Sequence, residues 1–380
     1  MTNTPGPTGD RPPIPETMTA MLLTGHGGPG QLSYRTDVPV PVPGPGEVLV
    51  RVRACGMNNT DINTRVGWYA KGGDDDGGWG GAIQFPRIQG ADVCGVVAGA
   101  GPGVDLDDPR WLAGRRVLID PWFLEPVPAP EPDSTLPGRR PGEPNRDTAR
   151  FFGSEVDGGF AQYTVAPLAN VHPVETDLSD AELATFACAA VTAEHLLSRA
   201  AVDDGTVVAV TGASGGVGTA AVQLAKARGA TVIAIAAATK GEALLELGAD
   251  AVVDRDAPDL AAAVSDASPT GRLDALADVV GGSMFAELLP LLRRGGHYAA
   301  SGAIAGALVE LDLRTLYLND LTLAGATVCP PGTFARVVEA IEVGHLKPVL
   351  AATYPLAELP AAQEAFQAKR FVGNLVVEIP

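Results

Sequence analysis

Apolar residues recur with two different spacings along the 380-residue chain. In the first part, short apolar runs near Met21, Leu32 and Val48–Gly56 are separated by turns that proline and glycine mark, which predicts antiparallel β-structure. In the second part, strand-like runs alternate with helical spacing, which predicts a doubly wound parallel sheet and hence an α/β fold. Its strands are expected at Val207–Val210, Thr231–Ala236, Ala251–Val253, Ala275–Val280, Gly296–Ala300 and Leu321–Ala324.

The strand pattern of the first part returns past about residue 345, so the doubly wound part is expected to be inserted within the first. The predicted domains are 19–172 with 345–380, and 173–344. Residues 1–18, rich in proline and small polar residues, are expected to form a disordered leader. Residues 124–150 are crowded with proline, glycine and charge, which predicts a surface insertion without a fixed core.

Two shorter segments carry local signals. Ser179 is followed three residues later by Glu182, a capping box that predicts the start of a helix or a helix pair. The glycine-rich stretch 67–81 predicts a solvated loop, but aromatic residues such as Trp68 and Tyr69 on a loop often line or cover a pocket.

The stretch TGASGGVG, residues 211–218, carries the clearest chemical signal. It lies between an apolar run that predicts a buried strand and a segment from Thr219 that predicts a helix. The glycines lack a Cβ, so the backbone can turn sharply and approach a pyrophosphate at the helix N-terminus. A purely structural turn is the alternative, but the flanking strand and helix favour a nucleotide site. Its residues are Ser214, Gly215, Gly216, Val217 and Gly218.

Composition narrows the function classes. The chain has 45 acidic and 27 basic residues and a net charge of −18, which argues against nucleic acid as a partner and favours a cytoplasmic protein. The four cysteines, Cys55, Cys94, Cys188 and Cys329, form no C-x-x-C pair and are expected to be reduced thiols. No apolar run is long enough for a membrane span, and no signal peptide is predicted.

Several motifs together resemble the medium-chain dehydrogenase/reductase superfamily. The resemblance covers the chain from about Met18 onward, apart from 124–150, and implies a GroES-like substrate domain, a Rossmann domain and a homodimer. It rests on VRACGMNNTDINTRVGWY, GADVCGVVAGAG, DGGFAQYTVAP, VTAEHLL, TGASGGVGTAAVQLAKARGATV and LLRRGGHYAASG.

Zinc-dependent members of this superfamily carry G-x-C-x-x-D, then G-H-E and a later cysteine, because catalytic zinc takes three protein ligands. This chain has Asn58 at the thiolate position and Ala91 at the imidazole position. Cys188 stands at the third position, but one thiol cannot hold a zinc ion. No metal is therefore expected. A rearranged site built from Cys55, Cys94, Cys188 and Asp92 is the alternative, although it needs a geometry that the family does not use.

The form G-M-N-x-x-D, followed by Arg65-Val-Gly67-Trp-Tyr69, resembles the zinc-free, quinone oxidoreductase-like branch. The resemblance implies hydride transfer from a nicotinamide to a quinone, an enone or another activated double bond. Such an acceptor is already polarised, so it needs hydrogen-bond donors and a proton source where an unactivated alcohol needs a Lewis acid.

The resemblance also suggests catalytic residues. The Asn58 amide could donate to a substrate carbonyl, or Asn58 could equally be a turn residue. Thr60 stands where zinc enzymes relay a proton, although without zinc it could serve only to hydrogen-bond the nicotinamide ribose. Tyr69 could place its phenol over the substrate, either as a donor or as an apolar wall. Asp61 and Asp92 are interpreted as structural hydrogen-bond acceptors that orient the loop. This role fits them better than that of a general base.

Charge predicts the cofactor. NAD sites place an acid about 20 residues beyond the glycines, to bind the ribose 2′-hydroxyl. Between Arg228 and Glu242 the chain has no acid, and the strand there leads into Thr239 and Lys240. A hydroxyl and a lysine favour a 2′-phosphate, so NADPH is the predicted cofactor. The alternative is a merely solvated Lys240.

Three further residues complete the predicted cofactor site. Thr192 matches a threonine that faces the nicotinamide in relatives, and Ser301 and Gly302 fall at the carboxyl end of a predicted strand. His195, on the helix of Thr192, is interpreted as a satisfied core or surface histidine. Two other functions stay open: a zinc-type alcohol dehydrogenase with altered ligands, and a nucleotide-binding protein without turnover.

Overall fold

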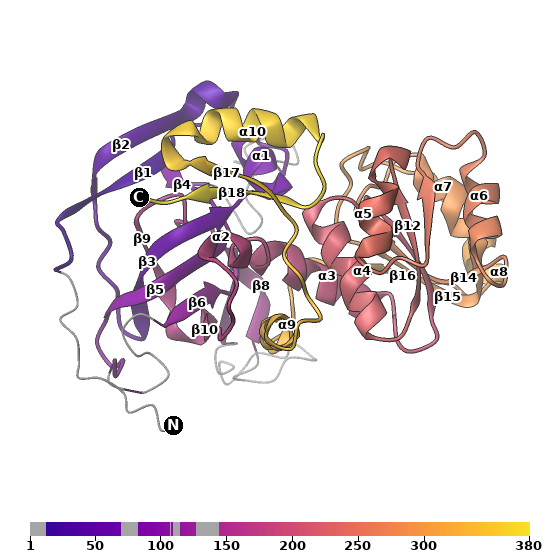
Figure 1. Cartoon of the computed structure of the whole chain (residues 1–380), viewed down its shortest axis with the longest axis horizontal. Coiled ribbons are helices and arrows are strands. Elements are labelled where there is room, and N and C mark those ends of the chain that lie inside the picture. Colours follow the sequence, from indigo (N-terminus) through magenta and orange to yellow (C-terminus); the bar gives the residue numbers. More distant parts are fainter. Residues whose placement is uncertain (1–12, 70–82, 107, 109–114, 127–143) are drawn as a thin grey trace, which may run out of the picture. The chain divides into compact units, whose positions relative to one another are not determined.

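The computed structural model describes residues 13–69, 83–106, 108, 115–126 and 144–380. The chain forms two compact units, whose elements Figure 1 labels. The first unit contains Met1–Ala187, Ala352–Ala368 and Leu375–Pro380, and the second contains Cys188–Ala351 and Lys369–Asn374. Each unit is therefore built from segments that are far apart in the sequence.

The second unit has a six-stranded parallel sheet with the strand order β13-β12-β11-β14-β15-β16. The order reverses between β11 and β14, as in doubly wound nucleotide-binding domains. This confirms the predicted α/β fold. The strands are β11 (Val207–Thr211), β12 (Thr231–Ala236), β13 (Ala251–Asp254), β14 (Leu273–Asp278), β15 (Leu292–Ala300) and β16 (Thr322–Gly325).

Two strands, β14 and β15, differ from their predicted bounds by more than one residue. β14 ends at Asp278 because the side chain of Asp278 accepts the N–H groups of Val280 and Gly281 and turns the chain out of the sheet. β15 begins at Leu292, earlier than predicted, because Leu292 still pairs with Leu273 before a register shift.

Helices flank this sheet, and aliphatic side chains from strands and helices are buried in one core cluster, among them Ile233, Leu276 and Leu288. α3 begins with Ala187 in the first unit, and its remaining residues belong to the second. The helices are α3 (Ala187–Arg199), α4 (Gly216–Ala227), α5 (Gly241–Glu246), α6 (Leu260–Ala267), α7 (Met284–Leu288), α8 (Leu313–Leu318) and α9 (Thr333–Glu342).

The first unit is mostly β-structure. One sheet has the order β10-β6-β5-β3-β18-β17 with β9 beside β3, and smaller sheets have the orders β2-β1-β4 and β7-β8. C-terminal strand β18 pairs antiparallel with β3. The strands are β1 (Thr17–Leu23), β2 (Leu32–Pro39), β3 (Glu47–Gly56), β4 (Arg87–Ile88), β5 (Asp92–Ala100), β6 (Arg116–Ile119), β7 (Trp122–Pro126), β8 (Pro144–Phe151), β9 (Tyr163–Pro167), β10 (Val171–Pro173), β17 (Leu350–Pro355) and β18 (Asn374–Glu378).

Among the described residues of this unit, three segments form α-helices: α1 (Asn59–Val66), α2 (Asp180–Leu183) and α10 (Leu359–Ala368). The predicted capping box is present, since the Ser179 hydroxyl accepts from the Glu182 N–H and the Glu182 carboxylate accepts from the Ser179 N–H. The helix pair α2 and α3 that follows confirms the prediction from the sequence.

Two predicted irregular segments are shorter than expected. The leader was predicted to reach residue 18, but β1 starts at Thr17 because Thr17 and Met18 pair with the end of β2. Residues 1–12 lie outside the described residues. Of the predicted insertion 124–150, the two flanks form β7 and β8, anchored by the edge-to-face rings of Trp122 and Phe151 at 4.8 Å. Residues 127–143 lie outside the described residues.

The first segment of the first unit continues to Ala187, past the predicted boundary at 172. The reason is close packing of the chain that follows α2 against β3. A Cβ built on Gly56 would lie 2.1 Å from the Ala184 carbonyl oxygen. The assignment of these units to substrate and cofactor stays a prediction.

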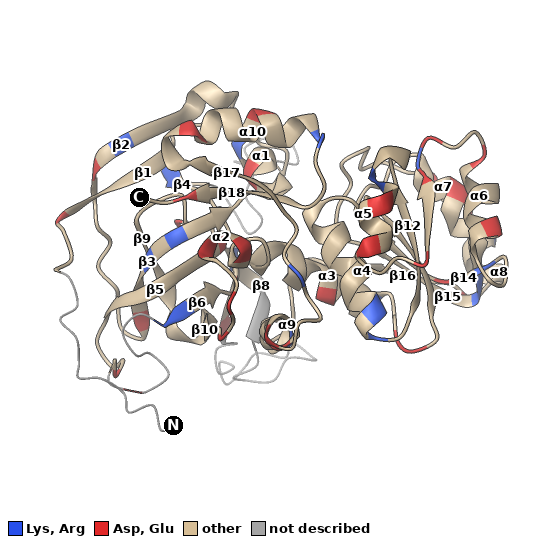
Figure 2. Cartoon of the chain, in the orientation of Figure 1, with Lys and Arg blue, Asp and Glu red and all other residues tan. Residues whose placement is uncertain are grey.

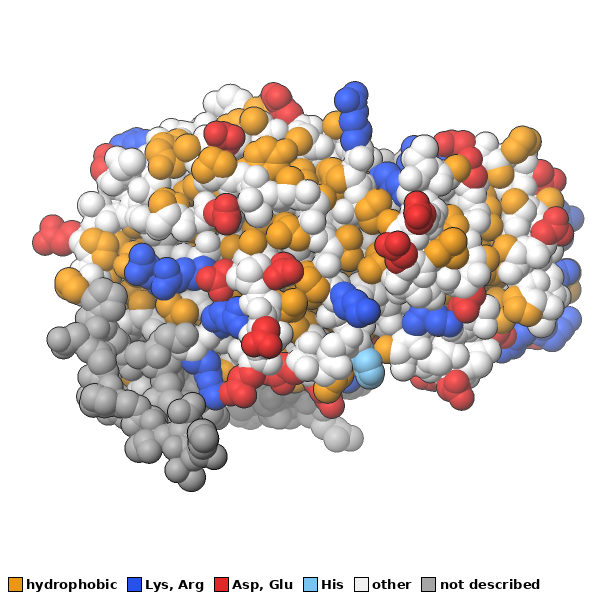
Figure 3. Space-filling model, viewed as in Figure 1, with side chains coloured by type: hydrophobic (Ala, Val, Ile, Leu, Met, Phe, Trp, Pro, Cys, Tyr) orange, Lys and Arg blue, Asp and Glu red, His pale blue; other side chains and the backbone are white. Residues whose placement is uncertain are grey.

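Surface and interior chemistry agree with the composition. Acidic residues lie on α5 and α6 in Figure 2, and on the face drawn in Figure 3 charged side chains are interspersed with apolar ones. All four cysteines lie in the described part of the chain, are buried and form no disulfide. In the described part of the chain, no helix combines the length and the apolar character needed to cross a membrane.

Candidate functional site

The glycine turn lies between β11 and α4 of the second unit. Helix α4 starts at Gly216, with Gly215 as its N-cap, and not at Thr219 as predicted. The helix can begin earlier because Gly216 and Gly218 have no side chain to clash. A Cβ on Gly216 would lie 2.2 Å from Asn374 Oδ1, and one on Gly218 would lie 2.3 Å from the Gly212 carbonyl oxygen.

The other two glycine positions of the turn differ in whether they have room for a side chain. Gly215 is exposed, and a Cβ there would meet only the Gly212 carbonyl oxygen at 3.6 Å. Packing within the protein therefore leaves room for a side chain at Gly215. Gly212 has a φ of +59°, and a Cβ there would lie 2.8 Å from Val279, so this position needs glycine. Sequence reasoning missed Gly212, although the bare motif contains it.

Lys240 is placed beside this turn. Its Nζ donates to Ser214 Oγ at 3.3 Å and to the Lys369 carbonyl oxygen at 2.9 Å. Burial, and then repulsion by Arg255, lower the pKa of Lys240. The structure thus brings together two predicted cofactor residues that are 26 positions apart in the sequence. Thr239 is exposed beside Lys240 in a 3-10 helix, Ala238–Lys240.

Lys369 is a candidate that sequence reasoning missed. It is 129 positions from Lys240 and comes from the C-terminal segment of the second unit. Burial, and then the charge of Lys240, lower the pKa of Lys369 to about 8. Its φ of +53° is rare for a residue with a side chain. No local signal in the sequence points to this lysine.

One acidic residue, Asp254, does lie close to the 3-10 helix that carries Thr239 and Lys240. Asp254, at the end of β13, accepts from the Ala238 N–H through Oδ1 at 3.3 Å. Because β13 neighbours β12, this carboxylate reaches the corner from the adjacent strand. It is engaged with the backbone of the segment that carries Lys240.

The remaining predicted cofactor residues are spread over the second unit. Ser301 follows β15, and its Oγ is buried with no hydrogen-bond partner in the described part of the chain. Gly302 is exposed, and a Cβ there would lie 2.8 Å from the Val279 carbonyl oxygen. Thr192 is half-buried on α3, and Val217 is half-buried in the first turn of α4.

The predicted catalytic residues lie in the first unit. Asn58 is the N-cap of α1 and is 8% exposed. Asp61 accepts from the Asn58 N–H at 2.8 Å and from the Gly90 N–H at 3.2 Å. The Asn58 side-chain amide donates to Asp92 Oδ2 at 2.7 Å. Three predicted residues therefore form one buried cluster.

The chemistry of the cluster follows from its burial. Burial is the main cause that raises the pKa of the Asp61 carboxyl to about 7, and repulsion from Asp92 adds to it. The backbone N–H groups oppose this shift. Both Asp61 and Asp92 accept hydrogen bonds here, and their role in a reaction stays a prediction. Asn58 is both a helix cap and an amide donor, so its two interpretations do not exclude each other.

Thr60 and Tyr69 lie outside this hydrogen-bonded cluster. Thr60 Oγ1 is buried and has no hydrogen-bond partner within the ranges that the structure describes. The half-buried Tyr69 accepts a hydrogen bond from the Asn63 amide at 3.3 Å and stacks edge-to-face with Trp68 at 5.3 Å. Of the predicted loop 67–81, residues 70–82 lie outside the described residues.

The donor set for a metal ion is poor in the described residues. No group of three His, Cys, Asp or Glu side chains there is arranged to hold one. Burial, followed by Asp61 and Asp92, raises the pKa of the Cys55 thiol, which disfavours the thiolate that zinc binds. Cys94 points its thiol to Asp180 at 3.9 Å. The rearranged zinc site is therefore not assembled by these side chains.

The fold and the glycine turn define the class of protein. A parallel sheet whose strand order reverses beside a glycine turn and a helix N-terminus is the arrangement that binds dinucleotides. Gly216 and Gly218 are required by packing, and the buried Ser301 hydroxyl, which has no hydrogen-bond partner among the described residues, lies at the same end of the sheet. These residues fit a bound dinucleotide, and the fold is the one that dinucleotide-dependent enzymes use.

Comparisons with known proteins agree. Residues 44–176 match the family described as alcohol dehydrogenase GroES-like domain, and residues 216–342 match the family described as zinc-binding dehydrogenase. A solved structure from Sinorhizobium meliloti 1021, provisionally assigned as an alcohol dehydrogenase, has 46% identity and a TM-score of 0.84, with 97% of this chain and 98% of that chain covered. The chain therefore belongs to the medium-chain dehydrogenase/reductase superfamily.

Two more distant relatives differ in cofactor. An NAD-dependent alcohol dehydrogenase from Sulfurisphaera tokodaii is 27% identical over 95% of this chain and 99% of its own length. A crotonyl-CoA carboxylase/reductase, AntE, solved in complex with NADP, has 25% identity and a TM-score of 0.80, with 98% of this chain and 97% of that chain covered. Membership of the superfamily therefore does not fix the preferred dinucleotide or the substrate, which have to be inferred from the residues of this chain.

Proposed function

We propose that this chain is a cytoplasmic, homodimeric reductase that transfers hydride from NADPH to a quinone, an enone or another activated double bond, without zinc. One observation carries the proposal. Where zinc-dependent relatives are expected to hold thiolate and imidazole ligands, this chain has Asn58, whose amide donates to Asp92 at 2.7 Å, and the apolar Ala91. An amide and a methyl group are not zinc ligands, and the neighbouring carboxylate is already engaged.

The acceptor class follows from the chemistry that these residues can provide. A carbonyl conjugated to a double bond develops negative charge on oxygen as it is reduced, and fixed N–H or O–H donors stabilise this charge. The Asn58 amide has a second N–H beside the one on Asp92, and Thr60 Oγ1 is an unpartnered buried hydroxyl in the described residues. Tyr69 offers a third polar group.

The cofactor follows from the corner beside the glycine turn. When bound, the nicotinamide supplies the hydride. Gly216, Gly218 and the start of α4 would hold the pyrophosphate, and Lys240 and Lys369 would bind a 2′-phosphate. Both lysines have a lowered pKa, from burial and then from repulsion by Arg255 at Lys240 and by Lys240 at Lys369, so an added anion would stabilise their charged forms.

The homodimer is supported by an exposed apolar segment of the second unit. Strand β16 lies at one edge of the six-stranded sheet, and a segment shortly before it exposes large apolar side chains. These are Ile304, Leu308, Val309, Leu313, Tyr317 and Leu318. A second copy could cover them. Light scattering should give twice the 38.9 kDa of the chain, and a monomer for the variant with Leu308 and Leu313 changed to Asp.

The test of the function uses the purified protein with a panel of acceptors. NADPH consumption is followed with 1,4-benzoquinone, cyclohexenone and crotonyl-CoA, and NAD⁺ reduction with primary and secondary alcohols. The protein is assayed before and after treatment with a zinc chelator, and its zinc content is measured. We expect turnover of at least one acceptor, unchanged by the chelator.

Two outcomes would contradict the proposal. One tightly bound zinc per chain, with activity only toward alcohols, would favour the second candidate, an NAD-dependent alcohol dehydrogenase with altered ligands. That candidate is favoured by the named activity of the Sulfurisphaera tokodaii relative and by Asp254 at the ribose corner. NADPH binding without turnover of any acceptor would favour a nucleotide-binding protein.

A further inference from the structure

The last residue of β14 is a buried aspartate whose carboxylate accepts hydrogen bonds from four donors. Asp278 is 1% exposed. Its Oδ1 accepts from Thr211 Oγ1 at 2.5 Å, from the Val280 N–H at 2.8 Å and from the Gly281 N–H at 3.0 Å. Its Oδ2 accepts from the Tyr298 hydroxyl at 2.8 Å. This side chain lies in the unit that carries the glycine turn.

The partners of Asp278 come from three neighbouring strands. Thr211 ends β11, Asp278 itself ends β14 and Tyr298 lies in β15. The Thr211 hydroxyl also accepts from the Val279 N–H at 3.0 Å, and the Asp278 carbonyl oxygen accepts from the Ser301 N–H at 3.0 Å. One residue therefore ties together the carboxyl ends of β11, β14 and β15.

These strand ends are where the chain leaves the sheet. Thr211 directly precedes Gly212, the first residue of the glycine turn, and a Cβ on Gly212 would touch Val279. After β14, Gly281 and Gly282 have φ values of +65° and +63°. In open α/β sheets, ligands bind at the carboxyl ends of the strands. The backbone that Asp278 fixes thus lies where sheets of this kind bind their ligands.

Burial makes the network rigid. Thr211 is 0% exposed and Tyr298 is 8% exposed, and burial followed by the charge of Asp278 raises the pKa of Tyr298 well above its usual value. Each of these donors would be left buried and unpaired without the carboxylate, which is costly in a low-dielectric interior. Removing the side chain should therefore shift the turns and not only loosen them.

We propose that Asp278 is a positioning residue for the dinucleotide: it holds the turn that starts at Thr211 and the turn after β14 in the geometry that binds the cofactor, without contacting it. The proposal rests on dinucleotide binding by the second unit and does not depend on the acceptor. It is independent of Lys240, which acts through its charge beside the glycine turn. Both NADPH and NADH should therefore be affected equally.

The test compares three substitutions by titrating the protein with NADPH and with NADH. Asp278→Ala leaves four donors without an acceptor, and we expect it to weaken both dinucleotides about 10- to 100-fold. Asp278→Asn should restore binding to within about threefold of the parent, because the amide oxygen can accept three of the donors while its N–H₂ donates to the Tyr298 hydroxyl.

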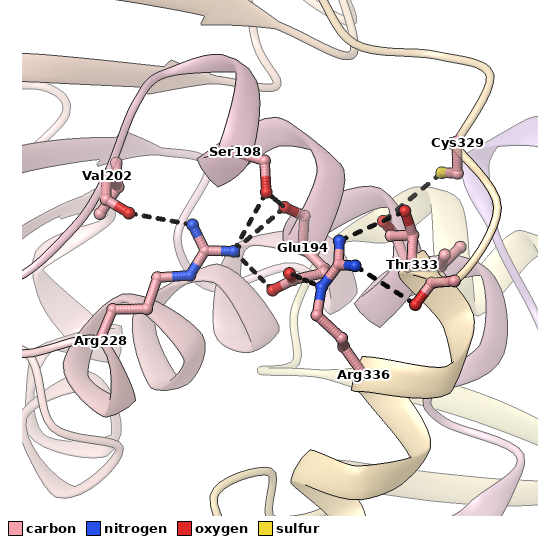
Figure 4. Close-up of polar contacts among 9 residues, drawn as sticks. Glu194, Ser198, Val202, Arg228, Cys329, Thr333 and Arg336 are labelled. Atoms are coloured by element: carbon pink, nitrogen blue, oxygen red, sulfur yellow. Dashed lines mark hydrogen bonds and ion pairs between the residues drawn. The ribbon is translucent and has the colours of Figure 1, made fainter.

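A buried carboxylate elsewhere in the same unit is the matched control. Glu194, whose side chain is 9% exposed, binds Arg228 at 2.6 Å and Arg336 at 2.9 Å and so links α3 with the C-cap of α4 and with α9, as Figure 4 shows. Glu194→Ala should lower the melting temperature as Asp278→Ala does, but leave both dissociation constants within about twofold of the parent, because the ion pairs of Glu194 lie among helices.

Two results would overturn the proposal: parent affinity in Asp278→Ala, or an equal loss in Glu194→Ala, which would show a general effect of stability. If Asp278→Ala does not fold, Thr211→Val removes the hydroxyl that joins the two turns and should weaken both dinucleotides about 3- to 10-fold. Parent affinity in that variant would overturn it as well. Since no acceptor is used, a parent protein that binds NADPH without turnover leaves this test intact and contradicts only the proposed function.

Discussion

Two buried polar clusters of this protein are built for different purposes. In the first unit, Asn58, Asp61 and Asp92 bond mainly to one another and to the start of α1, so the cluster fixes the direction of one amide side chain. In the second unit, Asp278 bonds to residues of three strand ends, so it fixes backbone. The comparison teaches that a buried carboxylate can direct either a functional group or a binding surface.

The largest expected effect breaks the first cluster at its amide. Asn58→Ala removes the proposed donor to the developing oxyanion, and we expect kcat to fall about 100-fold, as for other lost oxyanion donors. The dissociation constant of NADPH should stay within about twofold of the parent, since Asn58 lies in the other unit. Stopped-flow turnover and a fluorescence titration measure the two quantities. Parent turnover in Asn58→Ala would remove Asn58 from the site.

The next largest effect is expected in the second unit, at Lys240, and concerns the affinity for NADPH. Lys240→Ala should weaken NADPH about 10- to 100-fold, because a charge-assisted hydrogen bond to the 2′-phosphate is lost. NADH has no such phosphate and should change by less than about twofold. Lys226→Ala is the control, since it removes an equal charge that pairs with Asp250 in the same unit. Equal weakening of both dinucleotides would count against the role of Lys240.

A third effect is the pH dependence of cofactor choice. Lys369, whose pKa is lowered to about 8, is charged below that pH and loses its charge above it. NADPH affinity should therefore fall by about threefold to tenfold between pH 7 and pH 9, and NADH affinity should not. Titrations across this range measure the change. A dependence that survives in Lys369→Met would assign it to another group.

A smaller effect is expected at Tyr69. Tyr69→Phe keeps the ring beside Trp68 but removes the hydroxyl that contacts Asn63, and we expect kcat to fall about threefold to tenfold. NADPH binding should be unchanged. Steady-state kinetics with the best acceptor of the panel give the ratio. If Tyr69→Phe and Asn58→Ala both turn over at the parent rate, the proposed catalytic site is wrong.

The smallest effect concerns stability. The folded-state pKa of Asp61 is raised to about 7, above the value of an unfolded aspartate, so the protonated form favours the folded state. Its contribution is present at pH 4 and is lost as the pH rises to about 7. Asp61→Asn, which cannot ionise, should therefore destabilise the protein less at pH 8 than at pH 5. Urea unfolding at both values measures this, and an equal or larger loss at pH 8 would contradict the assignment.

Local sequence patterns determined the elements of the fold. The apolar run Thr231–Ala236 became β12 with the predicted bounds, and Ser179 with Glu182 forms the predicted capping box. These features depend on residues a few positions apart, where periodicity and hydrogen bonding to the nearest turn decide the conformation. The glycines of residues 211–218 belong to the same class, because their spacing is itself the signal.

Only the tertiary structure decided which residues act together. The partners Asn58 and Asp92 are 34 positions apart, Thr211 and Asp278 are 67 apart, and Lys240 and Lys369 are 129 apart. The sequence pointed to Asn58 and Lys240 but gave no signal for Lys369 or for the role of Asp278. Contacts of this length depend on strand order and on where the chain returns, because a side chain's hydrogen-bond partners and burial are set by the packed fold and not by its sequence neighbours.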